Sequence, residues 1–325
     1  MSLNGIVHSH VPSGTGALMA LSILALVAGL VLLTWCADMA VRSAETVSEH
    51  LGVSPVIVGA LIVGLGTSLP EMVVSGIAAA QRDSIDLAIG NVLGSNAANL
   101  SLVLGIGAVI TAVSGSRDVM RREGALMLAS TVLFGAFVID GTLARWEGIV
   151  LLVAMAVAAV LVASGPGTEE VPDAPGAEPG EVTSSIVKAI VGLVGVLIGA
   201  QLMVTGAVDI AEEFGASEAF IGLTVVAVGT SLPELATTVA SARRGAVDLI
   251  IGNVLGSNLF NALAVGGLAG VLGNGVIEES VTPSLIALVV VSVFVVGWGV
   301  VRHSFQRGVG IALLVAYAVI VALGA

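Results

Sequence analysis

Ten apolar stretches of membrane-spanning length dominate this sequence of 325 residues. About 20 apolar residues are long enough to cross a bilayer as a helix, and a helix satisfies its backbone polar groups internally. Because only short loops remain, we expect an all-α polytopic membrane protein with ten transmembrane helices. The stretches cover residues 16–41, 54–80, 86–113, 124–140, 145–164, 186–211, 217–242, 248–273, 282–301 and 308–324.

The composition excludes several other classes of protein. Only 10% of the residues are charged and 57% are hydrophobic, whereas soluble domains carry about 25% charged residues. The net charge of -12 argues against a nucleic-acid partner. The single cysteine, Cys36, excludes an internal disulfide and multi-cysteine metal sites, and its apolar surroundings predict a packed small side chain.

An acidic, proline-rich segment separates the fifth stretch from the sixth. Residues 165–185 hold four prolines and five acidic side chains, a composition that cannot bury a core. We therefore predict a first five-helix unit at 1–164, a linker at 165–185 and a second five-helix unit at 186–325.

The two units repeat each other. The block GTSLPE at 66–71 recurs at 229–234, and IGNVLGSN at 89–96 recurs at 251–258, with offsets of 163 and 162 residues. Two blocks in the same order at nearly the same offset indicate duplication. Since each unit has an odd number of spans, the second enters the membrane from the opposite side, which predicts two inverted five-helix repeats.

Basic residues predict the orientation, because cytoplasmic loops carry the excess of Lys and Arg. Nine basic residues fall on the side of the linker and two, Arg82 and Arg145, on the other. We expect a multi-pass protein of the cell membrane with both termini outside and the linker in the cytoplasm. The first stretch has no basic residue before it and is longer than a signal-peptide core, so we interpret it as part of the mature protein.

Two glutamates mark the candidate site. Glu71 and Glu234 lie near the middle of the second and seventh stretches, where a carboxylate is costly unless it meets a cation, a proton or a partner. Pro70 and Pro233 precede them, and a proline removes a helix hydrogen bond and exposes carbonyls one turn earlier. A protonated or hydrogen-bonded helix contact is the structural alternative for this pair.

Other oxygen-bearing side chains recur at matching positions. They share a helix face with the glutamates or with each other at spacings of four residues, or lie beside that face. Hydroxyl, amide and carboxylate oxygens suit hard cations such as Ca²⁺ and Na⁺ and fit zinc or copper poorly. The alternative role for any single serine is a hydrogen bond to a neighbouring helix, without ion binding. The set comprises Thr67, Ser68, Ser95, Asn99, Thr230, Ser231, Ser257 and Asn261.

On these paired blocks the chain resembles the cation/Ca²⁺ exchangers, and most closely the prokaryotic Na⁺/Ca²⁺ exchanger-like members, across all ten stretches. The resemblance implies that Glu71 and Glu234 are the central Ca²⁺ carboxylates and that Thr67 and Thr230 offer backbone carbonyls. It further implies that the four serines line flanking Na⁺ sites together with the carbonyls of Gly64 and Ala227. It implies an antiporter, not an enzyme, that exchanges Na⁺ for Ca²⁺ by alternating access and needs no cofactor.

One departure concerns the eighth stretch. Some relatives carry an acid where this chain has Asn261, so the site holds two formal negative charges, which puts K⁺ co-transport in doubt. The transported ions expected here are Ca²⁺ and Na⁺, and one copy in the bilayer contains both repeats and could suffice.

Three other functions were weighed. An H⁺/Ca²⁺ antiporter on the same fold would use the glutamates as proton carriers and leave the serines without an ion. An intramembrane serine hydrolase needs a base beside its nucleophile, and no Ser/His pair is evident. A passive cation channel needs a continuous pore, whereas inverted repeats with broken helices favour a gated central site.

Overall fold

The computed structural model describes residues 15–80, 85–164, 179–214, 227–273, 275–277 and 281–324. The described chain is almost entirely helical, as predicted, with two short strand pairs in its loops. The helices of the first half are α1 (Thr15–Leu51), α2 (Pro55–Val58), η1 (Gly59–Gly64), α3 (Leu65–Thr67), α4 (Leu69–Ala80), α5 (Ile85–Ala98), η2 (Asn99–Val103), α6 (Leu104–Ile110), α7 (Arg117–Val138) and α8 (Arg145–Ala163). Those of the second half are α9 (Pro179–Glu213), α11 (Ala227–Thr230), α12 (Leu232–Arg244), α13 (Val247–Phe260), η4 (Asn261–Val265), α14 (Gly266–Gly273), α15 (Thr282–Arg302) and α16 (Arg307–Gly324).

Six of these helical segments are long and apolar enough to cross a membrane, and the bent pair Pro55–Thr67 and Leu69–Ala80 makes a seventh. The predicted count of ten is not confirmed on the described residues. Helix α7 carries five charged residues among its first seven, α16 is short, and residues 217–226 of the seventh predicted span lie outside the described part. These spans show that the chain is a multi-pass membrane protein.

Helices α1 and α9 are longer than their predicted apolar stretches. Helix α1 continues ten residues beyond position 41 because Ala44 and Val47 keep a buried face after the apolar run has ended. Helix α9 begins at Pro179, so residues 179–185, which we assigned to the linker, are helical. Residues 165–178 of the predicted linker lie outside the described residues.

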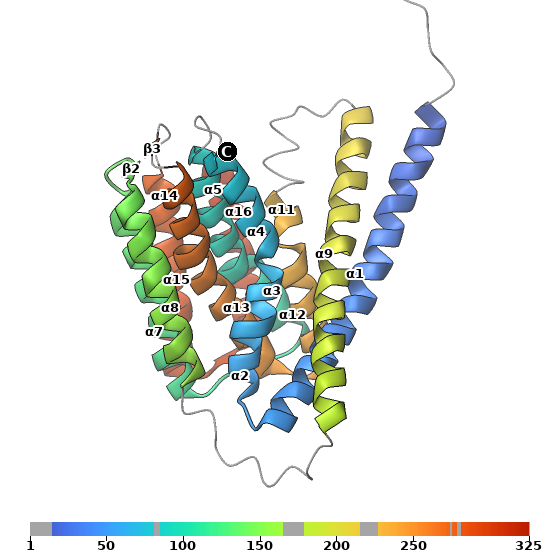
Figure 1. Ribbon diagram of the computed structural model, residues 1–325, viewed down its shortest axis with the longest axis horizontal. Helices are drawn as coiled ribbons and strands as arrows, with labels where there is room; N and C mark the ends of the chain where they lie inside the picture. Colours follow the sequence, from blue (N-terminus) through green and yellow to red (C-terminus); the bar gives the residue numbers. More distant parts are fainter. Residues whose placement is uncertain are drawn as a thin grey trace, which may run out of the picture.

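The centre of the bundle is formed by the helices that carry the repeated IGNVLGSN block. In the most apolar 18 residues of the span Val247–Gly273, 89% of the residues are buried, against 17% in the corresponding part of the α1 span. Helix α1 packs chiefly along α9, and the two lie side by side at one edge of the molecule (Figure 1). Cys36 is buried in this contact against Gly195, as predicted for a packed small side chain.

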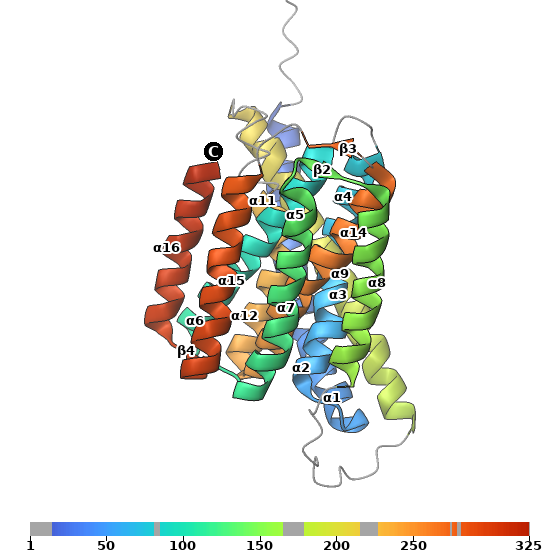
Figure 2. The same cartoon turned by 90° about the vertical axis from the view of Figure 1, so that its left-hand side faces the viewer.

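Two strand pairs connect loops that are distant in sequence. Strand β1 (Val113–Ser114) pairs antiparallel with β4 (Ser304–Phe305), and β2 (Thr142–Leu143) pairs antiparallel with β3 (Gly275–Val276). Figure 2 shows β2 and β3 at one end of the bundle and β4 at the other. The strand pairs therefore tie loops of the first half to loops of the second half at both ends.

Helix α13 approaches the second predicted span closely. A Cβ atom built on Gly252 would meet the Cα of Gly59 at 3.0 Å, and one on Gly256 would meet the Cα of Ala60 at 2.5 Å. Only glycine lets two helix backbones come this near. This contact brings the repeated block of the second half against the helix that leads to Glu71.

Candidate cation-binding site

The helix that carries Glu71 is broken just before that residue. The segment is bent by 45° between Thr67 and Leu69, and Ser68 at the break has φ -86° and ψ 8°. Pro70 has no N–H to donate and crowds the preceding turn, which accounts for the break. In the second half Ser231 has φ -87° and ψ 3° before Pro233, so the two repeated blocks share one local backbone geometry.

Both glutamates are completely buried, and their oxygens have few partners. The side chains of Glu71 and Glu234 are 0% exposed. One oxygen of Glu234 accepts a hydrogen bond from the Ser68 hydroxyl at 3.0 Å, and this bond links the two halves. Neither oxygen of Glu71 nor the second oxygen of Glu234 has a hydrogen-bond partner among the described residues. Buried charges are stable only when paired, so these carboxylates are arranged for a cation or a proton.

Two buried asparagines of the predicted site also have unpartnered side-chain atoms. Asn99 and Asn261 are the first residues of η2 and η4, single π-helical turns of a kind that often occurs at functional sites. Both are buried, and neither amide oxygen nor amide nitrogen has a partner in the described structure. The buried Ser231 hydroxyl likewise has none. Unpaired buried polar atoms are costly, and buried carboxylate, amide and hydroxyl oxygens have the chemistry of an oxygen-ligand ion site.

The remaining predicted residues lie along the same helices. The Gly64 carbonyl accepts the Ser257 hydroxyl at 3.3 Å and the Thr67 hydroxyl at 3.3 Å, so the structure brings these three predicted residues together across the two halves. Ser95 is buried in α5, one turn before Asn99. Thr230 ends α11, and Ala227 begins it. The side chain of Ala227 lies outside the described part.

Comparisons with known proteins identify the family of the chain. The model of the sodium/calcium exchanger protein family matches residues 21–163 and again 184–324. The chain belongs to the sodium/calcium exchanger family. The double match covers both predicted units, and the matched proteins described below are transporters rather than enzymes.

Individual relatives cover most of this family member. The sodium/calcium exchanger MaX1 of Methanosarcina acetivorans is 30% identical over 92% of this chain and 97% of its own. The putative antiporter CaxA of Alkalimonas amylolytica is 40% identical over 78% of this chain and 81% of its own. A solved structure of the sodium–calcium exchanger NCX_Mj, soaked with Na⁺ and Sr²⁺, has a TM-score of 0.83 and 32% identity over 94% of this chain and 98% of that one.

Two asparagines outside the predicted site hydrogen-bond to the segments that carry the glutamates of this exchanger-family chain. The Asn253 amide nitrogen donates to the Glu234 carbonyl at 3.4 Å and to the Thr237 hydroxyl at 3.2 Å, while its oxygen accepts the Thr67 hydroxyl at 3.3 Å. In the first half Asn91 donates to the Glu71 carbonyl at 3.4 Å. From sequence alone, packing and helix breaking is the simpler interpretation of Asn91 and Asn253. Their repetition inside IGNVLGSN, one turn before Ser95 and Ser257, is the signal that could have pointed to a role at the site.

Asp86 and Asp248 open the third and eighth apolar stretches at matching positions, so the sequence favours a helix-capping role for both. Asp248 is instead the second residue of α13, whose cap position is held by Ala246, and an acid there acts on the helix dipole rather than as a cap. Asp86 has the same place in α5.

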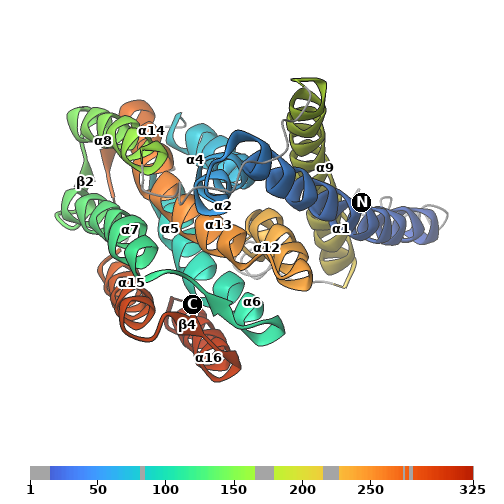
Figure 3. The ribbon, with the colours of Figure 1, turned by 90° about the horizontal axis from the view of Figure 1, so that it is seen from below.

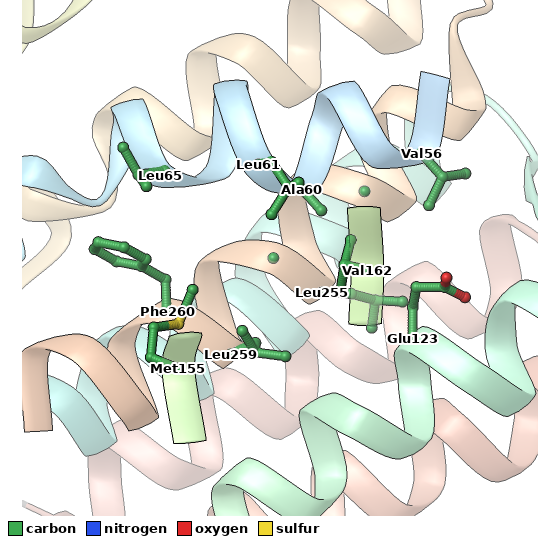
Figure 4. Close-up of a pocket in the computed structure, with 12 residues that line it drawn as sticks. Val56, Ala60, Leu61, Leu65, Glu123, Met155, Val162, Leu255, Leu259 and Phe260 are labelled. Atoms are coloured by element: carbon green, nitrogen blue, oxygen red, sulfur yellow. The ribbon is translucent and has the colours of Figure 1, made fainter. Parts of the chain in front are cut away.

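A third buried glutamate lies away from the site. Glu123 of α7 is 8% exposed and pairs with Arg122 at 3.4 Å. It lies at one end of a narrow apolar crevice between η1, α13 and α8, with Leu65 and Phe260 at the other end (Figure 4). Because Glu123 pairs with Arg122 and belongs to no repeated block, a variant at this position is a suitable control for variants of Glu71 and Glu234.

Proposed function

We propose that this member of the sodium/calcium exchanger family is a Na⁺-driven Ca²⁺ antiporter of the cell membrane that works by alternating access at one central site. The observation that carries the proposal is the pair of completely buried glutamates, three of whose four carboxylate oxygens have no partner in the described structure. Two carboxylates neutralise one Ca²⁺, and carbonyl, amide and hydroxyl oxygens complete the flexible shell that this ion prefers.

The ligands divide into a central and a flanking group. Glu71 and Glu234 hold Ca²⁺ together with the carbonyls of Thr67 and Thr230, and the amide oxygens of Asn99 and Asn261 lie on either side. Na⁺ binds at flanking positions lined by Ser68, Ser95, Ser231 and Ser257 with the carbonyls of Gly64 and Ala227. The hydrogen bond from Ser257 to Gly64 supports this grouping, because a hydroxyl and a carbonyl that already touch can bind one small cation together.

The architecture that serves this cycle is ten transmembrane helices in two inverted five-helix repeats, 1–164 and 186–325. Two features support it. The family model matches once in each half, and each strand pair joins a loop of one half to a loop of the other half in a symmetric pattern. The loop after the third span pairs with the loop after the ninth, and the loop after the eighth pairs with the loop after the fourth. The excess of basic residues places both termini outside and the linker in the cytoplasm.

Uptake of ⁴⁵Ca²⁺ into proteoliposomes tests the coupling ion. One set is loaded with Na⁺, and a matched set has an outward-directed proton gradient and no Na⁺. We expect uptake only with internal Na⁺, and the same vesicles with Glu71→Gln protein serve as the blank. Uptake driven by protons alone would show an H⁺/Ca²⁺ antiporter in which the glutamates carry protons.

A further inference from the structure

A groove separates the α1–α9 pair from α12. It has a volume of about 740 Å³, in the range of about 300–1,000 Å³ typical of small-molecule sites. Helices α1, α9 and α12 meet around it, and Figure 3 shows the three together at the end of the molecule where α12 ends. Its walls are mainly apolar, formed by Leu30 and Leu33 of α1, Met203 of α9, and Leu232, Leu235 and Val239 of α12.

The groove is polar at one end only. Asp38, one turn beyond Trp35 on α1, and Arg243, in the last turn of α12, line that end. Asp38 is already paired, with Arg42 at 2.9 Å and Arg244 at 3.7 Å. Arg243 is exposed, and no ion pair of Arg243 occurs among the described residues. The apolar groove therefore ends at a guanidinium that has no counter-ion in the described structure.

The length of the apolar wall matches one bilayer leaflet. From Leu232 to Arg243 the helix rises about 16 Å at 1.5 Å per residue. Half of a hydrocarbon core of about 30 Å is about 15 Å, so the groove runs from the middle of the membrane to the level of the headgroups. Trp35, which is 65% exposed beside the polar end, has the position that tryptophan favours at this boundary.

We propose that this groove binds one anionic phospholipid, with its phosphate on Arg243 and an acyl chain along the wall formed by α1 and α12. A basic residue at the membrane surface of a pocket between transmembrane helices is suited to such a headgroup. A path for hydrated cations would need polar walls, which this groove lacks. The bound chain lies against Leu232 and Leu235, the neighbours of Pro233 and Glu234, and sets the spacing between the α1–α9 pair and α12.

Tryptophan quenching tests the proposal without any transport measurement. The protein with Trp146→Phe and Trp298→Phe keeps Trp35 as its single tryptophan. It is reconstituted in phosphatidylcholine with a small fraction of lipid brominated on its acyl chains, either phosphatidylglycerol or phosphatidylcholine. We expect an enrichment of brominated phosphatidylglycerol at Trp35 of about fivefold over phosphatidylcholine, the value that corresponds to one basic residue at the surface.

Charge variants decide whether Arg243 makes the site. Arg243→Gln should remove the preference for phosphatidylglycerol, and Arg243→Lys should keep most of it. Arg121→Gln is the matched control, because Arg121 is an exposed arginine near the start of α7, on the end of the bundle where α12 also ends, and it does not line the groove. Equal quenching by the two brominated lipids, or a preference that survives Arg243→Gln, would overturn the proposal.

Discussion

The two halves of the candidate site have nearly the same sequence and different surroundings. Asn253 of α13 reaches across to the first half, where its oxygen accepts the Thr67 hydroxyl, and Gly256 lies against the backbone of Ala60. Asn91 of α5, the counterpart of Asn253, donates to the Glu71 carbonyl and the Ser75 hydroxyl within its own half, and a Cβ built on Gly94, the counterpart of Gly256, would meet none of the described residues within 4 Å. Gly256 is buried, whereas Gly94 is exposed.

Both breaks before the glutamates have the same backbone angles, so local sequence determines them. Within the part of the chain that the structure describes, the contacts around the two breaks differ, and residues 222–223, the counterparts of Gly59 and Ala60, lie outside that part. Variants at matching positions of the two halves measure how far the contacts differ.

The largest expected effect concerns the charges that the halves share. Glu71→Gln and Glu234→Gln should each lower Ca²⁺ transport by at least about 100-fold, about 2.8 kcal/mol, because each removes half of the neutralising charge. The fold should remain, since glutamine occupies nearly the same volume. Na⁺-dependent ⁴⁵Ca²⁺ uptake measures the effect.

Glu123→Gln is the control for these variants, because Glu123 is buried outside the site and pairs with Arg122. It should keep transport within about twofold of the unmodified protein, because Glu123 supplies no charge to the proposed site and glutamine keeps its volume. Full activity of either site variant, or an equal loss in Glu123→Gln, would contradict the assignment of the charges.

The glycines test the comparison through stability. Gly256→Ala should destabilise the protein by about 2 kcal/mol or more, because its Cβ would lie 2.5 Å from the Cα of Ala60 and backbone cannot move aside cheaply. Gly94→Ala should change stability by no more than about 1 kcal/mol, in the direction of the higher helix propensity of alanine. The apparent melting temperature in detergent measures both. Equal losses in the two variants would mean that the halves pack alike.

The sequence was sufficient to predict an all-helical membrane protein, because hydrophobic length is a local property. Each apolar stretch overlaps a described helix, and the repeated blocks located the two buried glutamates. Helix ends were less predictable: α1 continues to Leu51 on an amphipathic face after its apolar run ends, and α9 starts inside the proline-rich segment. Such ends depend on burial against another helix, which no single stretch encodes.

The site was predictable as a set of residue types and not as a network. Spacing predicts that Thr67 and Glu71 share one helix face with Ser68 beside it, and that Ser95 and Asn99 share a face of the next span. In the structure Glu71 and Asn99 are buried, and their side-chain oxygens have no partner among the described residues. Spacing did not identify the hydrogen bond from Ser68 to Glu234 or the bridging role of Asn253. Both join residues more than 150 positions apart, and their geometry follows from the close contact of helices from opposite halves.

Substitution of Asn253 should have a larger effect than substitution of Asn91, just as Gly256→Ala should have a larger effect than Gly94→Ala, but both effects should be smaller than those of the glutamates. Asn253→Ala removes bonds to α3 and α12 and should weaken apparent Ca²⁺ affinity by about tenfold, whereas Asn91→Ala, which loses bonds to α4 only, should weaken it by about threefold at about 1 kcal/mol or less per bond. Uptake as a function of Ca²⁺ concentration measures both. Asn253→Asp, which keeps the acceptor for Thr67, separates that bond from the donations to α12. A larger effect at Asn91 would reverse the comparison.

The last comparison concerns the serines at the two breaks. Ser68→Ala removes the hydrogen bond to Glu234, and a bond to a charged group is worth about 1.5–3 kcal/mol, so this variant should be the less stable of the two in buffer without Na⁺ or Ca²⁺. Ser231→Ala removes a buried hydroxyl that has no partner in the described structure, so its stability without ions should stay within about 0.5 kcal/mol of that of the unmodified protein.

Both serines are proposed Na⁺ ligands, so both variants should need a higher Na⁺ concentration for half-maximal Ca²⁺ uptake. Melting temperatures measured without ions and with saturating Na⁺ separate the two contributions: the serines should differ in the first condition and both lose Na⁺ stabilisation in the second. If Ser231→Ala left the Na⁺ dependence unchanged while Ser68→Ala shifted it, only the first half would hold a Na⁺ ligand at its break, and the asymmetry would extend from packing to ion binding.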